Sequence, residues 1–323
     1  MNQQKEMEEN VKELEAKNSG SLIASGQFAY VTNLHNNNVS VINIATNTVV
    51  ATIPVGSFPR FIAITPNGQF AYVTNEFSDS VSVINTTTNT VVATIPVGRY
   101  PWEIAITPNG QFAYATSSVG NSVYKIDTAT NTVVATIPVV GTIPFGPAQN
   151  VAITPNGQFA YVVDNFVASV INLATNTIVA QFSAGLYIGD IAITPNGQFA
   201  YVTNNFIVTP TVSVINTTTN TIVATIFVGL DPFGIAVTPN GQFAYVTNQT
   251  SNDVSVFNTA SNSVFATIPV GNNPIDIAIT PNGQFAYVTN ANTNNVSVIN
   301  IATNTVVATI PVGSFPWGIA ISP

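Results

Sequence analysis

A repeat limits what this chain can fold into more than any other feature. A segment reading Ile-Thr-Pro-Asn-Gly-Gln-Phe-Ala-Tyr-Val-Thr-Asn at residues 64–75 returns about every 42 residues along the 323-residue chain. Its tyrosines mark seven copies, at Tyr30, Tyr72, Tyr114, Tyr161, Tyr201, Tyr245 and Tyr287. This period is typical of arrays in which each repeat is one supersecondary unit that stacks on its neighbours. We therefore expect a single repeat domain.

Each repeat contains four strand-like segments, which in the second copy are residues 62–65, 70–74, 81–84 and 91–97. β-Branched and aromatic residues fill these segments, and an Asn-Gly pair between the first two supplies the backbone conformation that tight turns need. Prolines recur in the fourth segment, where a residue without an N–H is tolerated only at a sheet edge. The pattern predicts a four-stranded antiparallel meander with its fourth strand outermost.

The middle segments carry apolar residues on both faces, so neighbouring sheets must cover both. Seven such sheets around an axis form an all-β, seven-bladed β-propeller. The array begins with a second strand at residues 27–32 and ends with a first strand at residues 318–322. We therefore expect the C-terminal strand to close the ring by joining the N-terminal blade.

The N-terminal segment differs in composition from the repeats. Met7, Val11 and Leu14 have helical spacing, which predicts a short helix over residues 1–18. We divide the chain into a helical tail or appendage at residues 1–20 and a propeller at residues 21–323. An oligomer is expected only if this helix pairs with another copy.

Composition excludes several classes of function. After residue 18 the only basic side chains are Arg60, Arg99 and Lys125, too few for a surface that binds the phosphate backbone of nucleic acid. No apolar run reaches the 18 or more residues of a membrane helix, so no membrane insertion is expected. The absence of cysteine excludes disulfides and thiolate metal sites. The N-terminus has no apolar segment typical of a signal peptide.

The repeated Tyr-Val-Thr-Asn after Asn-Gly-Gln-Phe-Ala resembles the YVTN family of β-propeller repeats, over residues 22–323. The resemblance implies a propeller of the surface-layer or secreted type, and hence a secreted or cell-surface location. Copies three and four depart from the motif, reading Tyr-Ala-Thr-Ser at residues 114–117 and Tyr-Val-Val-Asp at residues 161–164. These departures are interpreted either as local adaptation or as drift.

The repeats vary mainly in the loops after the second and fourth strands, which should share one end of the ring. Binding residues favour variable loops on a rigid frame, so we expect function at that end. A column before the predicted inner strands places Glu103, Asp190 and Asp276 near the channel mouth. Their oxygens suit Ca²⁺ or Mg²⁺, and no other cofactor is expected. The alternative is that they are three solvated carboxylates.

Arginine and aromatic residues occur in the same connections. The predicted ligand-binding residues are Arg60, Tyr100, Trp102, Phe145, Phe233 and Trp317. They would suit a protein or carbohydrate partner, unless they fill gaps between blades. The two tryptophans are expected to be the most exposed of them.

We interpret the chain as a non-enzymatic binding or surface-display scaffold. The alternative is a metal-assisted lyase or hydrolase with an acidic site, because streptogramin lyases and lactonases are related propellers. The only histidine, His35, is expected to be a solvated loop residue.

Overall fold

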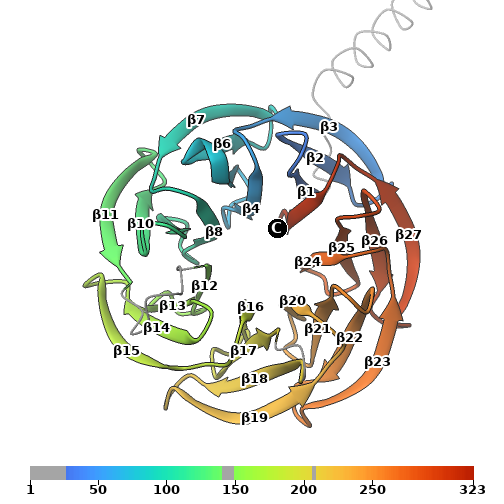
Figure 1. Cartoon of the computed structure of the whole chain (residues 1–323). Coiled ribbons are helices and arrows are strands. Elements are labelled where there is room, and N and C mark those ends of the chain that lie inside the picture. Colours follow the sequence, from blue (N-terminus) through green and yellow to red (C-terminus); the bar gives the residue numbers. More distant parts are fainter. Residues whose placement is uncertain (1–26, 140–148, 206–208) are drawn as a thin grey trace, which may run out of the picture.

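The computed structural model describes residues 27–139, 149–205 and 209–323. Seven four-stranded antiparallel sheets stand around a central axis, each forming one blade of a propeller (Figure 1). This confirms the predicted seven-bladed architecture. A 3-10 turn, η1 (Glu76–Ser78), lies in one loop.

Strands are given by blade from the axis outward. Blade 1 contains β28 (Pro316–Ile321), β1 (Phe28–Asn33), β2 (Asn38–Asn43) and β3 (Thr48–Pro54), and blade 2 contains β4 (Pro59–Ile64), β5 (Phe70–Asn75), β6 (Ser80–Asn85) and β7 (Thr90–Pro96). Blade 3 contains β8 (Pro101–Ile106), β9 (Phe112–Ser117), β10 (Ser122–Asp127) and β11 (Thr132–Pro138), and blade 4 contains β12 (Asn150–Ile153), β13 (Phe159–Val163), β14 (Val167–Asn172) and β15 (Thr177–Ser183). Blade 5 contains β16 (Ile188–Ile193), β17 (Phe199–Asn204), β18 (Thr211–Asn216) and β19 (Thr221–Phe227). Blade 6 contains β20 (Pro232–Val237), β21 (Phe243–Asn248), β22 (Asp253–Asn258) and β23 (Ser263–Pro269), and blade 7 contains β24 (Pro274–Ile279), β25 (Phe285–Asn290), β26 (Asn295–Asn300) and β27 (Thr305–Pro311).

The ring closes as predicted. The C-terminal strand β28 pairs antiparallel with β1, with Tyr30 opposite Ala320 and Val31 opposite Ile319. The proline-bearing fourth strands β3, β7, β11, β23 and β27 are all outermost. This agrees with the rule that proline is confined to sheet edges.

The predicted fold class included a short N-terminal helix, and this part of the prediction is corrected. It falls on residues 1–18, which lie outside the described residues, and the described ranges contain no α-helix. The described fold is therefore all-β without an α-helix, because its repeats carry strand rather than helical periodicity. No helix in those ranges is long and apolar enough to span a bilayer. The division at residues 20 and 21 stays a prediction.

The hydrophobic core lies between the blades. One cluster joins Tyr72 and Val83 of blade 2 to Ile104 and Ala113 of blade 3, and equivalent clusters occupy the other interfaces. All seven repeat tyrosines have 2% exposure or less. Each sheet is thus covered on both faces, as its apolar middle strands require.

The Tyr-Val-Thr-Asn motif fastens one blade to the next. The Tyr72 hydroxyl donates to Asn131 Oδ1 at 2.7 Å, in the following blade. The Thr74 hydroxyl donates to the Trp102 carbonyl of that blade at 2.7 Å and accepts the Phe61 N–H of its own blade at 3.0 Å. The threonine of the repeated motif therefore pairs buried backbone groups that would otherwise have no hydrogen-bond partner.

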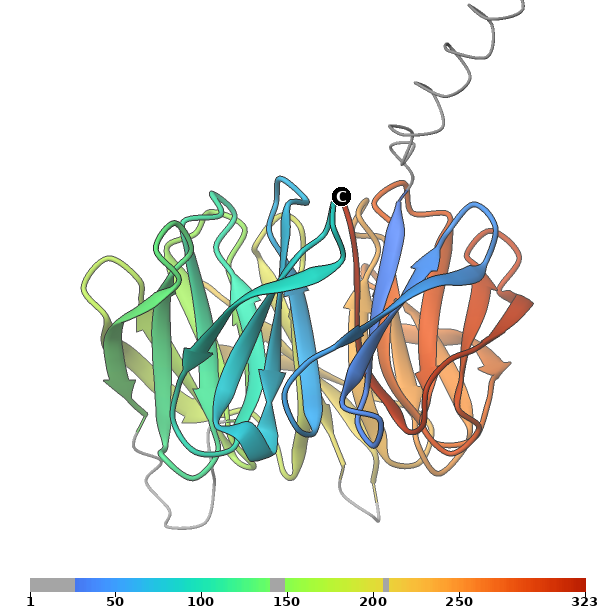
Figure 2. The ribbon, with the colours of Figure 1, turned by 90° about the horizontal axis from the view of Figure 1, so that it is seen from above.

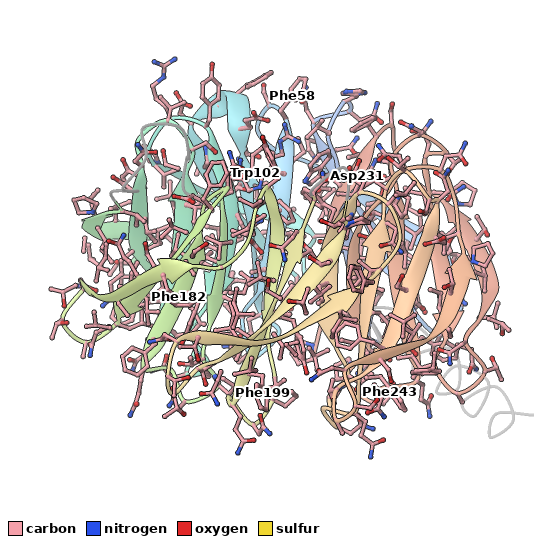
Figure 3. All side chains as sticks on the ribbon, turned by 60° about the horizontal axis from the view of Figure 1, so that its bottom comes forward. Phe58, Trp102, Phe182, Phe199, Asp231 and Phe243 are labelled. Atoms are coloured by element: carbon pink, nitrogen blue, oxygen red, sulfur yellow. The ribbon has the colours of Figure 1, made fainter. Side chains whose placement is uncertain are left out.

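The two ends of the ring differ in the way the repeats predicted. Turns joining strands one to two and three to four form the constant face, where Gly68 adopts a φ of 71° beside Pro323. The remaining loops form the variable face, at the opposite end from the C-terminus (Figure 2). In Figure 3 Phe58, Trp102 and Asp231 lie toward the variable face, and Phe199 and Phe243 toward the constant face.

Candidate functional site: the variable face

Arg60 is held between the two tryptophans on the variable face. Its Cζ lies 4.3 Å from the ring centroids of both Trp102 and Trp317, and its Nε donates to Glu76 Oε2 at 2.6 Å. The Arg60 and Glu76 side chains are only 13% and 14% exposed. The guanidinium therefore has its cation–π partners and its counter-ion within the chain.

Further aromatic rings extend this packing across blades. The ring of Phe233, from blade 6, lies 5.8 Å from that of Trp317, in blade 1, although blade 7 stands between them in the ring. Trp102, from blade 3, meets Trp317 edge-on at 6.1 Å. These rings converge over the axis. We call Arg60, Trp102, Phe233 and Trp317 the axial cluster.

The axial cluster thus brings together four of the six predicted ligand-binding residues, whose side chains pack on one another. Both tryptophans are partly buried, and neither indole N–H has a partner among the described residues. Arg60 lies against both rings, and the expectation that the tryptophans are the most exposed of the six residues stays a prediction. Tyr100 lies outside the axial cluster, and Phe145 lies outside the described residues.

A second set of rings, of which His35 and Phe77 are exposed, lies beside the axial cluster. His35 stacks on Phe315 at 4.7 Å and meets Phe58 at 5.9 Å, and Phe58 contacts Phe77 at 4.2 Å. Phe77 in turn meets Tyr100 edge-on at 5.8 Å and is 54% exposed. These five residues, His35, Phe58, Phe77, Tyr100 and Phe315, form what we call the aromatic row.

The backbone under the aromatic row is unusual. Phe58, Tyr100 and Phe315 all have φ between 53° and 55°, in the left-handed region, as does Tyr187 on blade 5. A side chain other than glycine or asparagine costs roughly 1–2 kcal/mol there. The equivalent residue on blade 7 is Asn273, with the same conformation at φ 56°. The aromatic side chains therefore occupy positions where the chain elsewhere uses a residue that tolerates this φ.

Neighbouring loops fix each of these positions. The Phe58 N–H donates to Asn37 Oδ1 at 2.9 Å, and the Phe58 carbonyl accepts the Glu76 N–H at 2.9 Å. The first bond comes from the loop of blade 1 and the second from the loop of blade 2. Residues other than glycine keep a left-handed conformation only where surrounding contacts hold them there, and such residues are concentrated at binding and catalytic sites.

The three predicted carboxylates are bound to backbone of the following blade. Asp190 Oδ2 accepts the Ile235 N–H at 3.0 Å, and Asp276 Oδ2 accepts the Ile319 N–H at 2.8 Å. Glu103 Oε2 likewise accepts an N–H from the following inner strand, that of Val151 at 2.9 Å. The other oxygens of the two aspartates accept N–H groups of their own strands. These carboxylates join inner strands and are not freely solvated.

Their electrostatics reflect this enclosure. Burial raises the pKa of Asp276 to about 7, against the opposing effect of its two N–H bonds. Burial, and next the charge of Asp276, raise the pKa of Asp190 well above its usual range. Burial and the charge of Asp190 do the same for the pKa of Glu103. The three groups are therefore near enough to disfavour one another's ionisation.

The predicted cation site stays a prediction. Among the described residues, no three histidine, aspartate or glutamate side chains form a group suited to a metal ion. Five of the six oxygens of Glu103, Asp190 and Asp276 already accept N–H groups, so a bound cation would compete with those bonds.

His35 is an exposed loop residue, as expected, but sequence reasoning missed its ring contacts and the role of Phe77. Both lie in loops after a second strand, and these loops share the variable face with connections that carry Phe58, Tyr100 or Phe315. The presence of aromatic residues in both kinds of loop is the signal that could have identified the aromatic row. Its geometry depends on loops from different blades meeting, which no local pattern encodes.

Comparisons with known proteins agree with this fold. A family model described as YNCE-like beta-propeller matches residues 16–322, and the search of curated proteins found no match. Hydrazine synthase from Kuenenia stuttgartiensis has a similar structure, with a TM-score of 0.77 and 25% identity over 84% of this chain and 92% of that one. A functionally unknown protein from Desulfotomaculum acetoxidans has a TM-score of 0.79 and 21% identity, covering 91% and 98% of the two chains.

A putative 6-phosphogluconolactonase from Bacteroides fragilis has a TM-score of 0.76 and 17% identity, covering 94% of this chain and 100% of that one. The neighbours differ in described function, so the likeness carries the fold alone. The finer YVTN and surface-layer resemblance stays a prediction. Matched over nearly its whole length and built from seven four-stranded blades, the chain belongs to the YNCE-like β-propeller family.

Proposed function

We propose that this protein is a non-enzymatic binding scaffold that docks another protein on its variable face. The observation that carries the proposal is the aromatic row on left-handed backbone. Three of its five rings, those of Phe58, Tyr100 and Phe315, cost conformational energy where asparagine would cost less, and Phe77 beside them stays 54% exposed. Retaining that cost is understandable if the rings contribute to binding.

A protein partner suits the row better than a stacked sugar. Phe58 meets His35 at an interplanar angle of 64°, and Tyr100 meets Phe77 at 70°, so the rings do not form one flat platform. Aromatic and arginine side chains are enriched in protein interfaces, and here Arg99 lies 5.5 Å from the Tyr100 ring. The left-handed positions also hold the row in place before binding, which lowers the entropy lost on association.

The test compares two phenylalanines of nearly equal exposure. Phe77 lies in the aromatic row at 54%, and Phe265 lies on the outer strand β23 at 52%. Immobilised wild-type, Phe77→Ala and Phe265→Ala proteins are exposed to a lysate of the producing organism, and retained proteins are quantified by mass spectrometry. We expect a partner held by wild type and Phe265→Ala to bind about fivefold or more weakly to Phe77→Ala. Equal retention by all three proteins would remove the proposal.

The alternative, a metal-assisted lyase or hydrolase at the acidic residues, has weaker support. Most of the carboxylate oxygens are engaged by backbone N–H groups, and Arg60 is engaged by Glu76 and the tryptophans. Calorimetric titration with Ca²⁺ and Mg²⁺ tests it, since a saturable heat abolished by Asp190→Asn would revive the alternative.

We further propose a secreted or cell-surface location, which rests on the YVTN resemblance of the repeat. Fractionation of the producing cells tests it directly. Recovery of the protein only from the cytoplasm would contradict it.

A further inference from the structure

Four grooves recur at successive blade interfaces on the constant face. They lie between blades 4 and 5, 5 and 6, 6 and 7, and 7 and 1, with volumes of about 420, 480, 660 and 340 Å³. These volumes fall in the range of small-molecule sites. The grooves are at the opposite end of the ring from the aromatic row, so they are independent of the proposed function.

The repeat itself builds the lining. One blade contributes a phenylalanine and a tyrosine from its second strand, such as Phe243 and Tyr245 of β21. The following blade contributes amides and hydroxyls from its turns, such as Asn300 and Asn304. Among the described residues, no charged side chain lines any of the four grooves.

Amide groups in three of the grooves are already oriented. The hydroxyls of Tyr161, Tyr245 and Tyr287 donate to the side-chain oxygens of Asn220, Asn304 and Asn47 at 2.7–2.8 Å. Each asparagine therefore has its carbonyl oxygen held by a tyrosine, which leaves the amide NH₂ available as a donor. An aromatic wall beside a fixed amide donor is the usual composition of a selective polar pocket.

We propose that these interblade grooves bind neutral oligosaccharides. A charged ligand would be desolvated without a counter-charge, which is costly. A purely apolar ligand would remove water from the amides and hydroxyls without replacing its hydrogen bonds. A neutral sugar offers a C–H face to the partly exposed phenylalanine ring of each groove and hydroxyls to the amides, while the tyrosine behind them stays buried, so the sugar satisfies both accessible parts of the lining.

The groove between blades 6 and 7 is the most developed. Phe265 of β23 stands where the other six outer strands carry valine, and its ring lies 5.3 Å from that of Phe243. This groove is also the largest of the four. The rings of Phe243 on β21 and Phe265 on β23 meet across the intervening β22 and enlarge the aromatic wall, so this groove should be the tightest site.

The groove between blades 5 and 6 lacks the tyrosine–asparagine hydrogen bond of the other three grooves. Tyr201 and Asn262 are not bonded to each other, and Tyr201 Oη and Asn262 Oδ1 are buried without partners among the described residues. Phe257, which replaces the isoleucine of the other blades, packs edge-on against Tyr201 at 5.1 Å. The sites should therefore differ in affinity although their sequences are similar.

Repetition around one face also predicts the form of the natural ligand. Several sites on a rigid ring bind a polymer more tightly than its short fragments, because the second contact is intramolecular. A repetitive neutral polysaccharide fits this arrangement. We therefore expect a soluble polymer to bind about 10²-fold or more tightly than its own tetrasaccharide.

The experiment titrates the full-length protein with cellotetraose, mannotetraose and chitotetraose, and with tetragalacturonate as the charged comparison, by calorimetry and ligand-observed NMR. We expect at least one neutral tetrasaccharide to bind and tetragalacturonate not to bind. Phe265→Val, which gives blade 6 the side chain of its neighbours, should weaken the tightest class of sites about 3- to 10-fold. Phe77→Ala, equally exposed but on the variable face, should leave the titration unchanged.

Three outcomes would overturn the inference. They are failure of all three neutral tetrasaccharides to bind, binding of tetragalacturonate as tight as that of the neutral sugars, and a loss with Phe77→Ala as large as with Phe265→Val. A polymer that binds no more tightly than its tetrasaccharide would overturn the multivalent part. Because Phe77 serves here as the control, loss of the protein partner and loss of sugar binding are separately measurable.

Discussion

At the scale of single residues, one departure from the repeat is matched by another. In six blades a threonine hydroxyl donates to a backbone carbonyl of the next blade, but blade 4 has Val163 at that position. There the Asn150 side chain donates instead, to the Gly189 carbonyl. The donor has moved from the second strand to the first while the buried acceptor keeps a partner. The departure in copy four is therefore a structural exchange and not a sign of a ligand site.

This exchange predicts a rescue. Asn150→Ala should lower the free energy of unfolding by about 1–3 kcal/mol, because the buried Gly189 carbonyl loses its donor. Adding Val163→Thr should recover most of that loss by restoring the hydroxyl donor of the other blades. Chemical denaturation of the two variants and of Val163→Thr alone measures the effect. If Val163→Thr fails to rescue, the two side chains do not share one acceptor.

At the scale of the strand, the carboxylates contribute a pH-dependent link between inner strands. Asp276 joins β24 to β28 through the Ile319 N–H, and its pKa is about 7 against an ordinary value of 3.8. Between those values the folded chain binds more protons than the unfolded chain. The stabilising contribution is therefore full below about pH 4 and is lost as the pH rises through about 7.

The resulting prediction concerns the pH profile of unfolding. Wild-type protein should lose stability as the pH rises from about 4 to about 7, and Asp276→Asn should flatten this slope because asparagine does not ionise. Asparagine occupies the same column in blade 4, as Asn150, so the position accepts its shape. Denaturant midpoints at pH 4, 5.5, 7 and 8 test it. A variant with the wild-type slope would show that other groups control the pH dependence.

These elements also mark what sequence could predict. The positions of Pro54 and Pro96 correctly predicted the order of the strands, and the turn residues around Gly68 correctly predicted the constant face. Both predictions depend on local backbone rules. The contact of Phe233 with Trp317 depends on two blades separated by a third, and the engagement of Asp190 depends on an N–H of the next blade. No local rule encodes distances across the axis. Placing Glu103, Asp190 and Asp276 in one column therefore did not predict that they accept backbone N–H groups of the next blade.

At the scale of the whole molecule, ring closure is the feature on which the other interfaces depend. Strand β28 supplies the inner edge of blade 1 and also donates the Gly318 N–H to Thr32 at 2.8 Å. Removing residues 316–323 should therefore abolish the cooperative unfolding transition seen by circular dichroism. A synthetic peptide of those residues, added in excess, should restore part of it. A truncated chain that unfolds at the wild-type denaturant concentration would contradict this role.

The seam between β1 and β28 has a mechanical consequence. The start of β1 and the end of β28 are paired neighbours, with Ala29 opposite Ile321 and the Phe28 N–H donating to Ser322 Oγ. Both leave the ring at the constant face (Figure 2). Tension applied through the two ends would load this ladder one rung at a time, as a zipper is opened, and never all rungs together in shear. A ring held together by seven packed interfaces would thus yield at low force along the single seam between β1 and β28.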